Sequence, residues 1–220
     1  MISPKDTILI SGDSWGCGEW GPGPSKYGAV HNGLEYFLTE YGCKVINVSV
    51  PASANVAAIK RLKNALNETT PDCIFWFQTS PIRDLRPYEE NEELMPKNAN
   101  EYNQIHKELL NSSYESLNNL GVKIHCMGGV SPLLDDINNY SNLISFIPSI
   151  IKMFGGKDPK YWIGGWVDSR VRLDPEFLTE LEELSEPQDL LPKKWFYPDG
   201  IHPNRHAHYK IFEYILEQHK

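Results

Sequence analysis

The sequence contains no long hydrophobic run and no dense cluster of lysine and arginine. No apolar stretch approaches the roughly 20 residues that a helix needs to span a bilayer, so we expect no membrane span. Lys and Arg number 21 against 29 Asp and Glu, which gives a formal net charge of −8. Such a charge offers phosphate backbones and anionic membrane surfaces little attraction. We therefore do not expect a nucleic acid as a partner.

Cysteine is also scarce, and the four that occur form no Cys-x-x-Cys pair. Cys43, Cys73 and Cys126 lie in apolar, strand-like runs, whereas Cys17 lies in a glycine-rich loop. Because free cysteine behaves mostly as a small hydrophobe, we interpret them as buried thiols of a reducing compartment. The first six residues lack an apolar signal segment with a cleavage site. We expect a soluble protein, cytoplasmic or otherwise without a recognisable export signal.

Apolar strand-like runs alternate with segments of helical periodicity along most of the chain. With 220 residues, 40% of them hydrophobic, the chain can bury one substantial core. Alternation of strands and helices predicts a parallel sheet with helices on both faces, an α/β fold of three α/β/α layers. We predict a single domain, with an insertion or lid-like elaboration over about 135–195. Extra peripheral helices are the alternative for that segment. The predicted strands are 7–10, 44–50, 73–77 and 122–127, and the predicted helices are 28–41, 56–66 (capped by Ser53 or Asn55), 100–120 and 205–218.

The first motif that carries chemistry follows the first predicted strand. It reads Gly12-Asp13-Ser14-Trp15. In parallel sheets ligands bind beyond the carboxyl ends of the strands, so this serine exposes its hydroxyl and its own N–H at the ligand edge. An ordinary strand-to-helix turn is the other interpretation of these residues.

The second motif lies near the other end of the chain and includes Asp199, His202 and Pro203. A nucleophilic serine needs a base within about 3 Å and a carboxylate that orients the imidazole. An aspartate three residues before a histidine can turn back onto its ring nitrogen. Of the two later histidines, we predict that His208 packs in the core and that His206 is solvated.

These two motifs resemble those of the SGNH hydrolases, also called GDSL esterases or lipases. The resemblance covers roughly the first 130 and last 25 residues. It implies a flavodoxin-like sheet of about five parallel strands, with Ser14 as nucleophile, His202 as base and Asp199 as the group that orients it. Ala207 and His208 also match the family pattern, which continues to a small residue and a second histidine. We expect no metal and no other cofactor.

Two middle blocks depart from the family pattern. After the second strand the family usually has a glycine whose N–H helps to hold the oxyanion, and Ala52 stands in that stretch here. After the third strand the family has an asparagine that also donates to the oxyanion, and this chain has none there. An ungapped match places Ser80 at that position, with Thr79 or Gln78 possible if the register slips. The expected oxyanion donors are therefore Ser14 and Ala52 through their N–H groups, with Ser80 or Thr79.

Charged and aromatic residues near these loops offer candidate substrate contacts. Arg83, Asp84 and Arg86 follow the third strand and either pair with one another or hold an anionic or sugar group of a substrate. Trp15 and other tryptophans either line the site or belong to the core. We give Trp15 and Arg83 as candidate substrate-binding residues. The other tryptophans considered are Trp20, Trp162, Trp166 and Trp195.

Three functions remain open from the sequence. The favoured one is a serine esterase that removes a short, acetyl-like acyl group from a carbohydrate or another small ester. The second is a binding or structural module that kept the fold and lost efficient catalysis. The third is a metal-dependent hydrolase that uses Asp199, His202, His206 and His208, which the different helical faces of His206 and His208 disfavour. The oligomeric state stays open.

Overall fold

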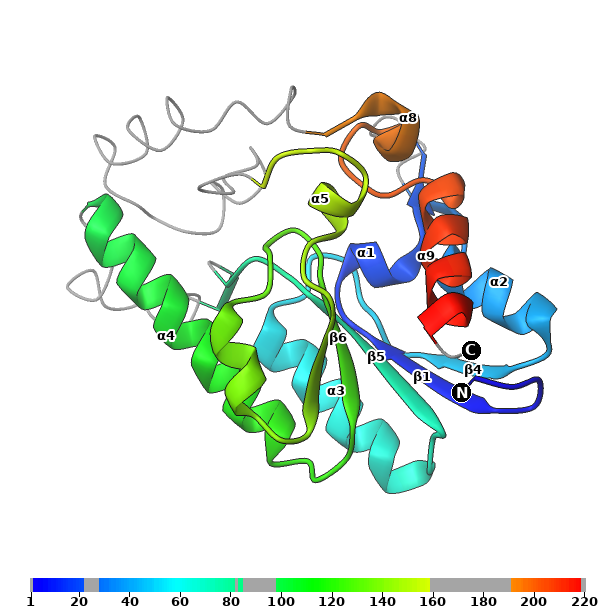
Figure 1. Ribbon diagram of the computed structural model, residues 1–220, viewed down its shortest axis with the longest axis horizontal. Helices are drawn as coiled ribbons and strands as arrows, with labels where there is room; N and C mark the ends of the chain where they lie inside the picture. Colours follow the sequence, from blue (N-terminus) through cyan, green and yellow to red (C-terminus); the bar gives the residue numbers. More distant parts are fainter. Residues whose placement is uncertain (1, 22–27, 82, 85–97, 159–190, 219–220) are drawn as a thin grey trace.

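The computed structural model describes residues 2–21, 28–81, 83–84, 98–158 and 191–218. Five parallel strands form its central sheet in the order β4-β1-β5-β6-β7 (Figure 1). Numbered along the chain, this is the 2-1-3-4-5 order of flavodoxin-like folds. The predicted three-layer α/β architecture is thus confirmed. The strands are β1 (Thr7–Ser11), β4 (Lys44–Asn47), β5 (Cys73–Gln78), β6 (Ile124–Gly128) and β7 (Leu143–Ile147).

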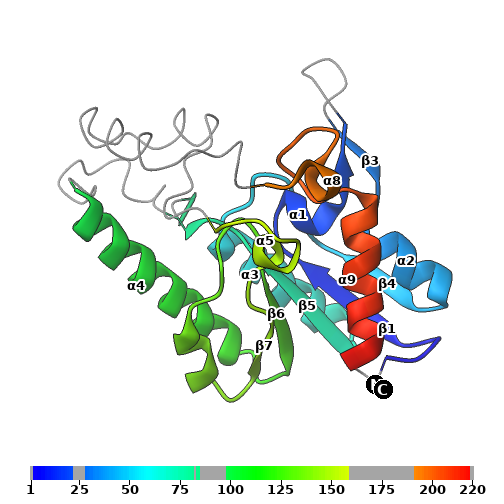
Figure 2. The same ribbon diagram turned by 45° about the horizontal axis from the view of Figure 1, so that its top comes forward.

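Helices cover both faces of this sheet, as Figures 1 and 2 show. The helix α2 (Leu34–Tyr41) packs beside α9 (Arg205–Gln218) on one face. The other face carries α3 (Asn55–Glu68) and α4 (Ala99–Asn118). None of the helices within the described ranges combines the length and apolarity that crossing a membrane requires.

Alternation of side chains along the central strands builds two hydrophobic cores. Successive side chains of a strand point to opposite faces. In β5, Phe75 and Phe77 therefore pack toward α2 and α9, whereas Ile74 and Trp76 pack toward α3 and α4. Burial on both faces explains why β5 reads as a continuous apolar run rather than as an alternating one.

Two sequence predictions about helix starts are wrong. The segment predicted as a helix over 28–41 begins with a strand, β3 (Ala29–His31), which pairs antiparallel with β2 (Glu19–Trp20). Neither Ser53 nor Asn55 caps α3, whose cap residue Ala54 makes no side-chain cap bond. Asn55 is buried in a polar network instead, and Val56, expected on the apolar face, is 64% exposed.

The segment predicted as an insertion from residue 135 contains part of the sheet itself. A 3₁₀ helix (Asp135–Asn139) leads into β7, the fifth strand, and the short helix α5 (Ile150–Met153) follows. Pairing with β6 makes Leu143–Ile147 a strand of the central sheet, inside the range predicted as an elaboration. Residues 159–190, including Trp162 and Trp166, lie outside the described residues.

Candidate active site

Ser14 begins α1 (Ser14–Cys17), a short helix that directly follows β1. Gly12 allows this connection to pass close to β5, since an added Cβ would lie 2.7 Å from the Cβ of Phe77. Asp13 caps the helix by accepting a hydrogen bond of 3.0 Å from the N–H of Trp15. Because β1 and β5 flank the point where the strand order reverses, Ser14 lies where such sheets bind ligands.

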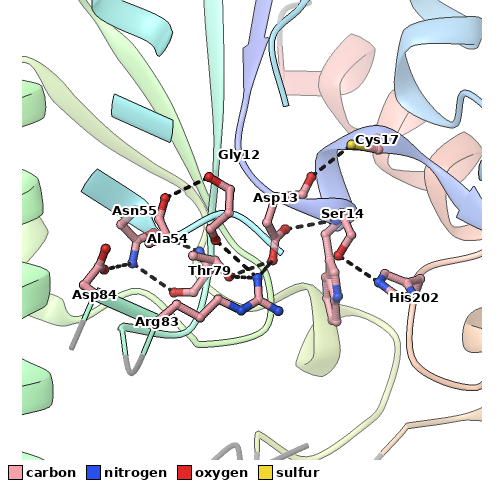
Figure 3. A network of polar contacts seen from close by, with 12 residues as sticks. Gly12, Asp13, Ser14, Cys17, Ala54, Asn55, Thr79, Arg83, Asp84 and His202 are labelled. Atoms are coloured by element: carbon pink, nitrogen blue, oxygen red, sulfur yellow. Dashed lines mark hydrogen bonds and ion pairs between the residues drawn. The ribbon is translucent and has the colours of Figure 1, made fainter. Parts of the chain in front are cut away.

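Ser14, His202 and Asp199 form one hydrogen-bonded chain (Figure 3 shows the contact between Ser14 and His202). The Nε2 of His202 lies 2.8 Å from the Oγ of Ser14, and its Nδ1 lies 2.5 Å from Oδ2 of Asp199. Ser14 and His202 are buried, with 5% and 4% of their surfaces exposed. The other carboxylate oxygen of Asp199 accepts hydrogen bonds from the N–H groups of Ile201 and His202. These bonds fix the carboxylate against the imidazole.

The loop that carries His202 is held at the start of α9 and at α8 (Lys193–Phe196). Asn204 accepts a hydrogen bond from the N–H of Ala207, which caps α9, and its amide donates to the carbonyl of Lys194. Asn204, two residues after His202, thus holds this loop to both α8 and α9. Sequence reasoning did not find this cap.

Glu19 and Arg205 join the serine segment to the histidine segment. The guanidinium of Arg205 donates to both carboxylate oxygens of Glu19, at 2.7 Å from Nη2 to Oε1 and 3.0 Å from Nε to Oε2. Burial alone would raise the pKa of Glu19, but the hydrogen bonds and charge of Arg205 outweigh it and lower the pKa. The pair lies 186 residues apart in the chain, so no local pattern reveals it.

An aromatic ring packs against the histidine. Trp20 stacks on the imidazole of His202 with ring centroids 5.3 Å apart, and its indole N–H donates to the carbonyl of Ser14. Trp15, a candidate substrate contact from the sequence, is fully buried and packs against Phe196. Trp15 therefore belongs to the core rather than to an open wall of the site. Trp195 is partly buried and stacks on Phe154.

On the side of Asp13 that faces away from the histidine lies a buried charged cluster (Figure 3). The Nη1 of Arg83 donates to Oδ2 of Asp13 at 2.7 Å, and the hydroxyl of Thr79 donates to the same oxygen at 2.6 Å. Asp13 and Arg83 are 0% and 3% exposed. The sequence suggested that Arg83 either binds substrate or pairs with its neighbours, whereas the structure pairs it with Asp13. Arg86 lies outside the described residues.

Asp84, the carboxylate of the cluster predicted with Arg83 and Arg86, accepts hydrogen bonds from Asn55 and from the N–H of Val56. The amide of Asn55 donates to Asp84 at 2.9 Å and to the carbonyl of Thr79, and its oxygen accepts from the N–H of Thr79. Burial raises the pKa of Asp84, and hydrogen bonds from Val56 and Asn55 oppose that shift. Asn55 thereby fixes the backbone that follows β5 to the start of α3.

The expected oxyanion donors differ in what else they bind. The N–H of Ser14 has no acceptor within its own helix, because Ser14 is the first helical residue. The hydroxyl of Thr79 donates its only proton to Asp13, and the amide of Gln78 donates to the carbonyls of Ser131 and Pro132. The Ser80 hydroxyl is buried and has no partner within the described ranges. Of Gln78, Thr79 and Ser80, only Ser80 has a side-chain proton with no acceptor among the described residues.

Ala52 occupies a turn that normally favours glycine. The N–H of Ser53 donates to the carbonyl of Val50, which closes a turn with Pro51 and Ala52 at its centre. Ala52 has φ of +55°, in the left-handed region that non-glycine residues seldom adopt. The chain therefore holds alanine in a glycine-like conformation, within the stretch where the family that the sequence resembles usually has a glycine.

Cys17 and His208 carry two further groups that could act as nucleophile or base, and both are neutral at neutral pH. Burial raises the pKa of the Cys17 thiol to about 12, so it stays protonated at neutral pH. His208 is fully buried as expected, and burial lowers its pKa to about 4, whereas His206 is exposed. No cluster of three or more His, Cys, Asp or Glu side chains suited to a metal occurs in the described part of the chain.

No protein-family model matches this chain, and no curated protein matches it. Among solved structures, it is similar to a lipase/acylhydrolase from Enterococcus faecalis at 13% identity and a TM-score of 0.48, over 97% of this chain and 94% of that one. It is similar to the psychrotrophic esterase EstA from Pseudoalteromonas sp. at 14% identity and a TM-score of 0.44, over 97% of this chain and 96% of the esterase. A catalytic mutant of Axe2, an acetylxylan esterase from Geobacillus stearothermophilus, matches at 15% identity and a TM-score of 0.45, over 99% of this chain and 95% of Axe2. Similarity at this level assigns no family, so the function proposed below rests on the geometry of the site.

Proposed function

We propose that this protein is a serine ester hydrolase of the SGNH type, with Ser14, His202 and Asp199 as its catalytic triad. The single observation that carries the proposal is the continuous chain of hydrogen bonds from the Ser14 hydroxyl through the imidazole to Asp199. Serine is a weak nucleophile until a base accepts its proton, and a carboxylate behind that base stabilises the imidazolium that forms.

The proposed reaction proceeds through an acyl-enzyme. The Oγ of Ser14 attacks the ester carbonyl carbon while Nε2 of His202 accepts the hydroxyl proton. The tetrahedral intermediate collapses, the C–O bond to the alcohol breaks, and His202 returns the proton to the leaving oxygen. A water molecule then attacks the acyl-serine, with His202 again accepting and returning a proton, which releases the acid.

Negative charge on the substrate oxygen must be met by donors near Ser14. The candidates are the N–H groups of Ser14 and Ala52 and the hydroxyl of Ser80. The uncommitted proton of Ser80 and the left-handed backbone of Ala52 support their inclusion. Such donors stabilise the transition state because they are oriented before the charge develops.

The proposed substrate is a short, acetyl-like ester of a carbohydrate or another small alcohol. This substrate class rests on the sequence resemblance and on the lack of a long apolar lid segment in the sequence. The geometry of the site supports the reaction class more directly than it supports the substrate.

A catalytically weak binding module is the second candidate. Two observations favour it: no asparagine follows β5, and both the N–H and the hydroxyl of Thr79 are bound within the protein. Loss of one oxyanion donor costs about 10²- to 10³-fold in turnover in serine hydrolases.

Hydrolysis of 4-nitrophenyl acetate by the wild type and by Ser14→Ala separates the two candidates. We expect the wild type to turn the ester over and Ser14→Ala to lose roughly 10⁴-fold or more of this activity. Ser113→Ala is the matched control, because Ser113 is a buried serine on α4 whose hydroxyl bonds within its own helix. Wild-type turnover in Ser14→Ala would contradict the triad, and an inactive, correctly folded wild type would support the binding module.

A further inference from the structure

One nitrogen atom of Arg83 contacts three separate segments at the carboxyl end of the sheet. Its Nη1 lies 2.7 Å from Oδ2 of Asp13, 2.6 Å from the hydroxyl oxygen of Thr79 and 3.3 Å from the carbonyl oxygen of Ser53. Asp13 follows β1, Ser53 lies between β4 and α3, and Thr79 follows β5. Figure 3 shows the guanidinium between Asp13 and Thr79.

Each of these contacts lies next to a proposed oxyanion donor. Asp13 precedes Ser14, Ser53 follows Ala52 and Thr79 precedes Ser80. The three donors therefore come from three segments that follow three different strands, and one guanidinium nitrogen joins the residues beside them. No other described side chain has hydrogen bonds to all three of these residues in the structure.

Burial makes these contacts rigid. Asp13 is 0% exposed and Arg83 is 3% exposed, so water cannot readily replace either partner. Asp13 is fixed further, since its two carboxylate oxygens also accept from Thr79 and from the N–H of Trp15. Removing one member of such a pair leaves an uncompensated buried charge that the surrounding backbone must move to solvate.

We propose that Arg83 is a positioning residue for the oxyanion pocket, and this inference rests on the serine hydrolase function proposed above. Through Asp13, Ser53 and Thr79 it sets the relative positions of the three segments that carry the donors. Arg83 itself does not contact the reacting atoms. It acts through its neighbours, whereas the family that the sequence resembles supplies an asparagine donor from the segment after the third strand.

The inference predicts a kinetic effect that loss of stability alone does not produce. Donors aimed at the oxyanion act mainly in the transition state, so their displacement lowers kcat and leaves KM nearly unchanged. A misplacement of about 1 Å can cost on the order of 10²-fold in rate. A purely structural role would instead reduce the fraction of folded enzyme and leave the turnover of each folded molecule intact.

The test measures kcat and KM for 4-nitrophenyl acetate per active site, with active sites counted by complete labelling with a fluorophosphonate. Four variants are compared: Arg83→Met, Arg83→Lys, Thr79→Val and Thr79→Ser. We expect Arg83→Met and Thr79→Val to lower kcat per labelled site roughly 10- to 100-fold, with KM within about threefold of wild type. Thr79→Ser keeps the hydroxyl that bonds to Asp13 and should stay within about threefold of wild type. Arg83→Lys keeps the charge but loses the planar fork, so its kcat should lie between those of Arg83→Met and wild type.

Lys107→Met is the control, because Lys107 forms an exposed ion pair with Asp136 away from these loops. If Arg83→Met fails to fold, Thr79→Val decides, since it removes the hydroxyl that donates to Asp13 and accepts from Arg83, and keeps the guanidinium and its contact with Asp13. The inference is overturned if Thr79→Val, and Arg83→Met where it folds, keep kcat per labelled site within about twofold of wild type. In that case the hydrolase function still stands. A wild type that neither turns over the ester nor reacts with the fluorophosphonate overturns the proposed function, and this inference with it.

Discussion

The two sides of the Asp13-Ser14 dipeptide carry different kinds of polar contact. On one side Ser14, His202 and Asp199 form a chain of hydrogen bonds, in which the imidazole is placed to accept the hydroxyl proton and the carboxylate to stabilise the imidazolium. On the other side Asp13 is bound to a guanidinium that remains charged at any ordinary pH. The first side is suited to chemistry and the second to holding backbone in place. Substitutions on the first side should therefore change turnover alone, whereas those on the second should change turnover and stability together.

Among conservative changes in the chain of Ser14, His202 and Asp199, we expect Asp199→Asn to have the largest effect on turnover. An amide at this position cannot stabilise the imidazolium and favours the wrong tautomer of His202, so turnover should fall by about 10⁴-fold. The hydrogen bonds from Ile201 and His202 can persist on the remaining amide oxygen. Steady-state kinetics and thermal unfolding measure the two quantities. A change confined to KM would reassign Asp199 to substrate binding.

Ser80→Ala tests whether the segment after β5, on the Arg83 side of Asp13, supplies a hydrogen-bond donor to the oxyanion. We expect turnover to fall roughly 10- to 1000-fold with substrate binding less affected, because such a donor acts mainly in the transition state. Thr79→Ala is the informative partner, since Thr79 donates to Asp13 and would act through the loop positions instead. Ser80→Asn restores the residue of the resembling family and should preserve or raise activity. Turnover of Ser80→Ala within about twofold of wild type would place the donor elsewhere.

Ala52→Gly should have the smallest effect, a small change in the free energy of unfolding. It measures backbone strain separately from the side-chain contacts compared above. Glycine relieves the strain at φ of +55° but adds freedom to the unfolded chain, so stability should change by less than about 1 kcal/mol. Ala57→Gly is the control: Ala57 lies within the helix α3, so it has no such strain to relieve and should lose roughly 0.5–1 kcal/mol. Denaturant unfolding of both variants gives the difference. Equal losses of stability would show that Ala52 is not strained.

The strands of the core were predictable because burial on both faces leaves a continuous apolar run in the sequence. The predicted runs 7–10, 73–77 and 122–127 lie within two residues of β1, β5 and β6. The strand β7 was not predicted because its sequence, Leu-Ile-Ser-Phe-Ile, lies in the segment interpreted as an insertion and is followed closely by the apolar residues of α5. β3 was assigned to a helix because Val30 fits the helical spacing that continues into α2.

The candidate site was predictable to the extent that its contacts are local. Asp199 and His202 are three residues apart, so their spacing alone suggested the bond between them. Arg83 and Asp13 are 70 residues apart, and the sequence offered Asp84 as a nearer partner. Only the topology brings the loop after β5 beside the loop after β1, because those two strands are neighbours in the sheet. Trp20 was noted as an aromatic, yet its stacking on His202 depends on the same long-range packing.

The central claim is that Ser14 is a nucleophile activated by His202, and covalent labelling tests it most directly. The measurement is reaction of the wild type with a fluorophosphonate, followed by mass-spectrometric mapping of the modified residue, with Ser14→Ala and His202→Ala alongside. The account predicts one adduct per chain, located on Ser14, absent in Ser14→Ala and strongly slowed in His202→Ala. An adduct on another residue, or equally fast labelling of Ser14 without His202, would contradict it.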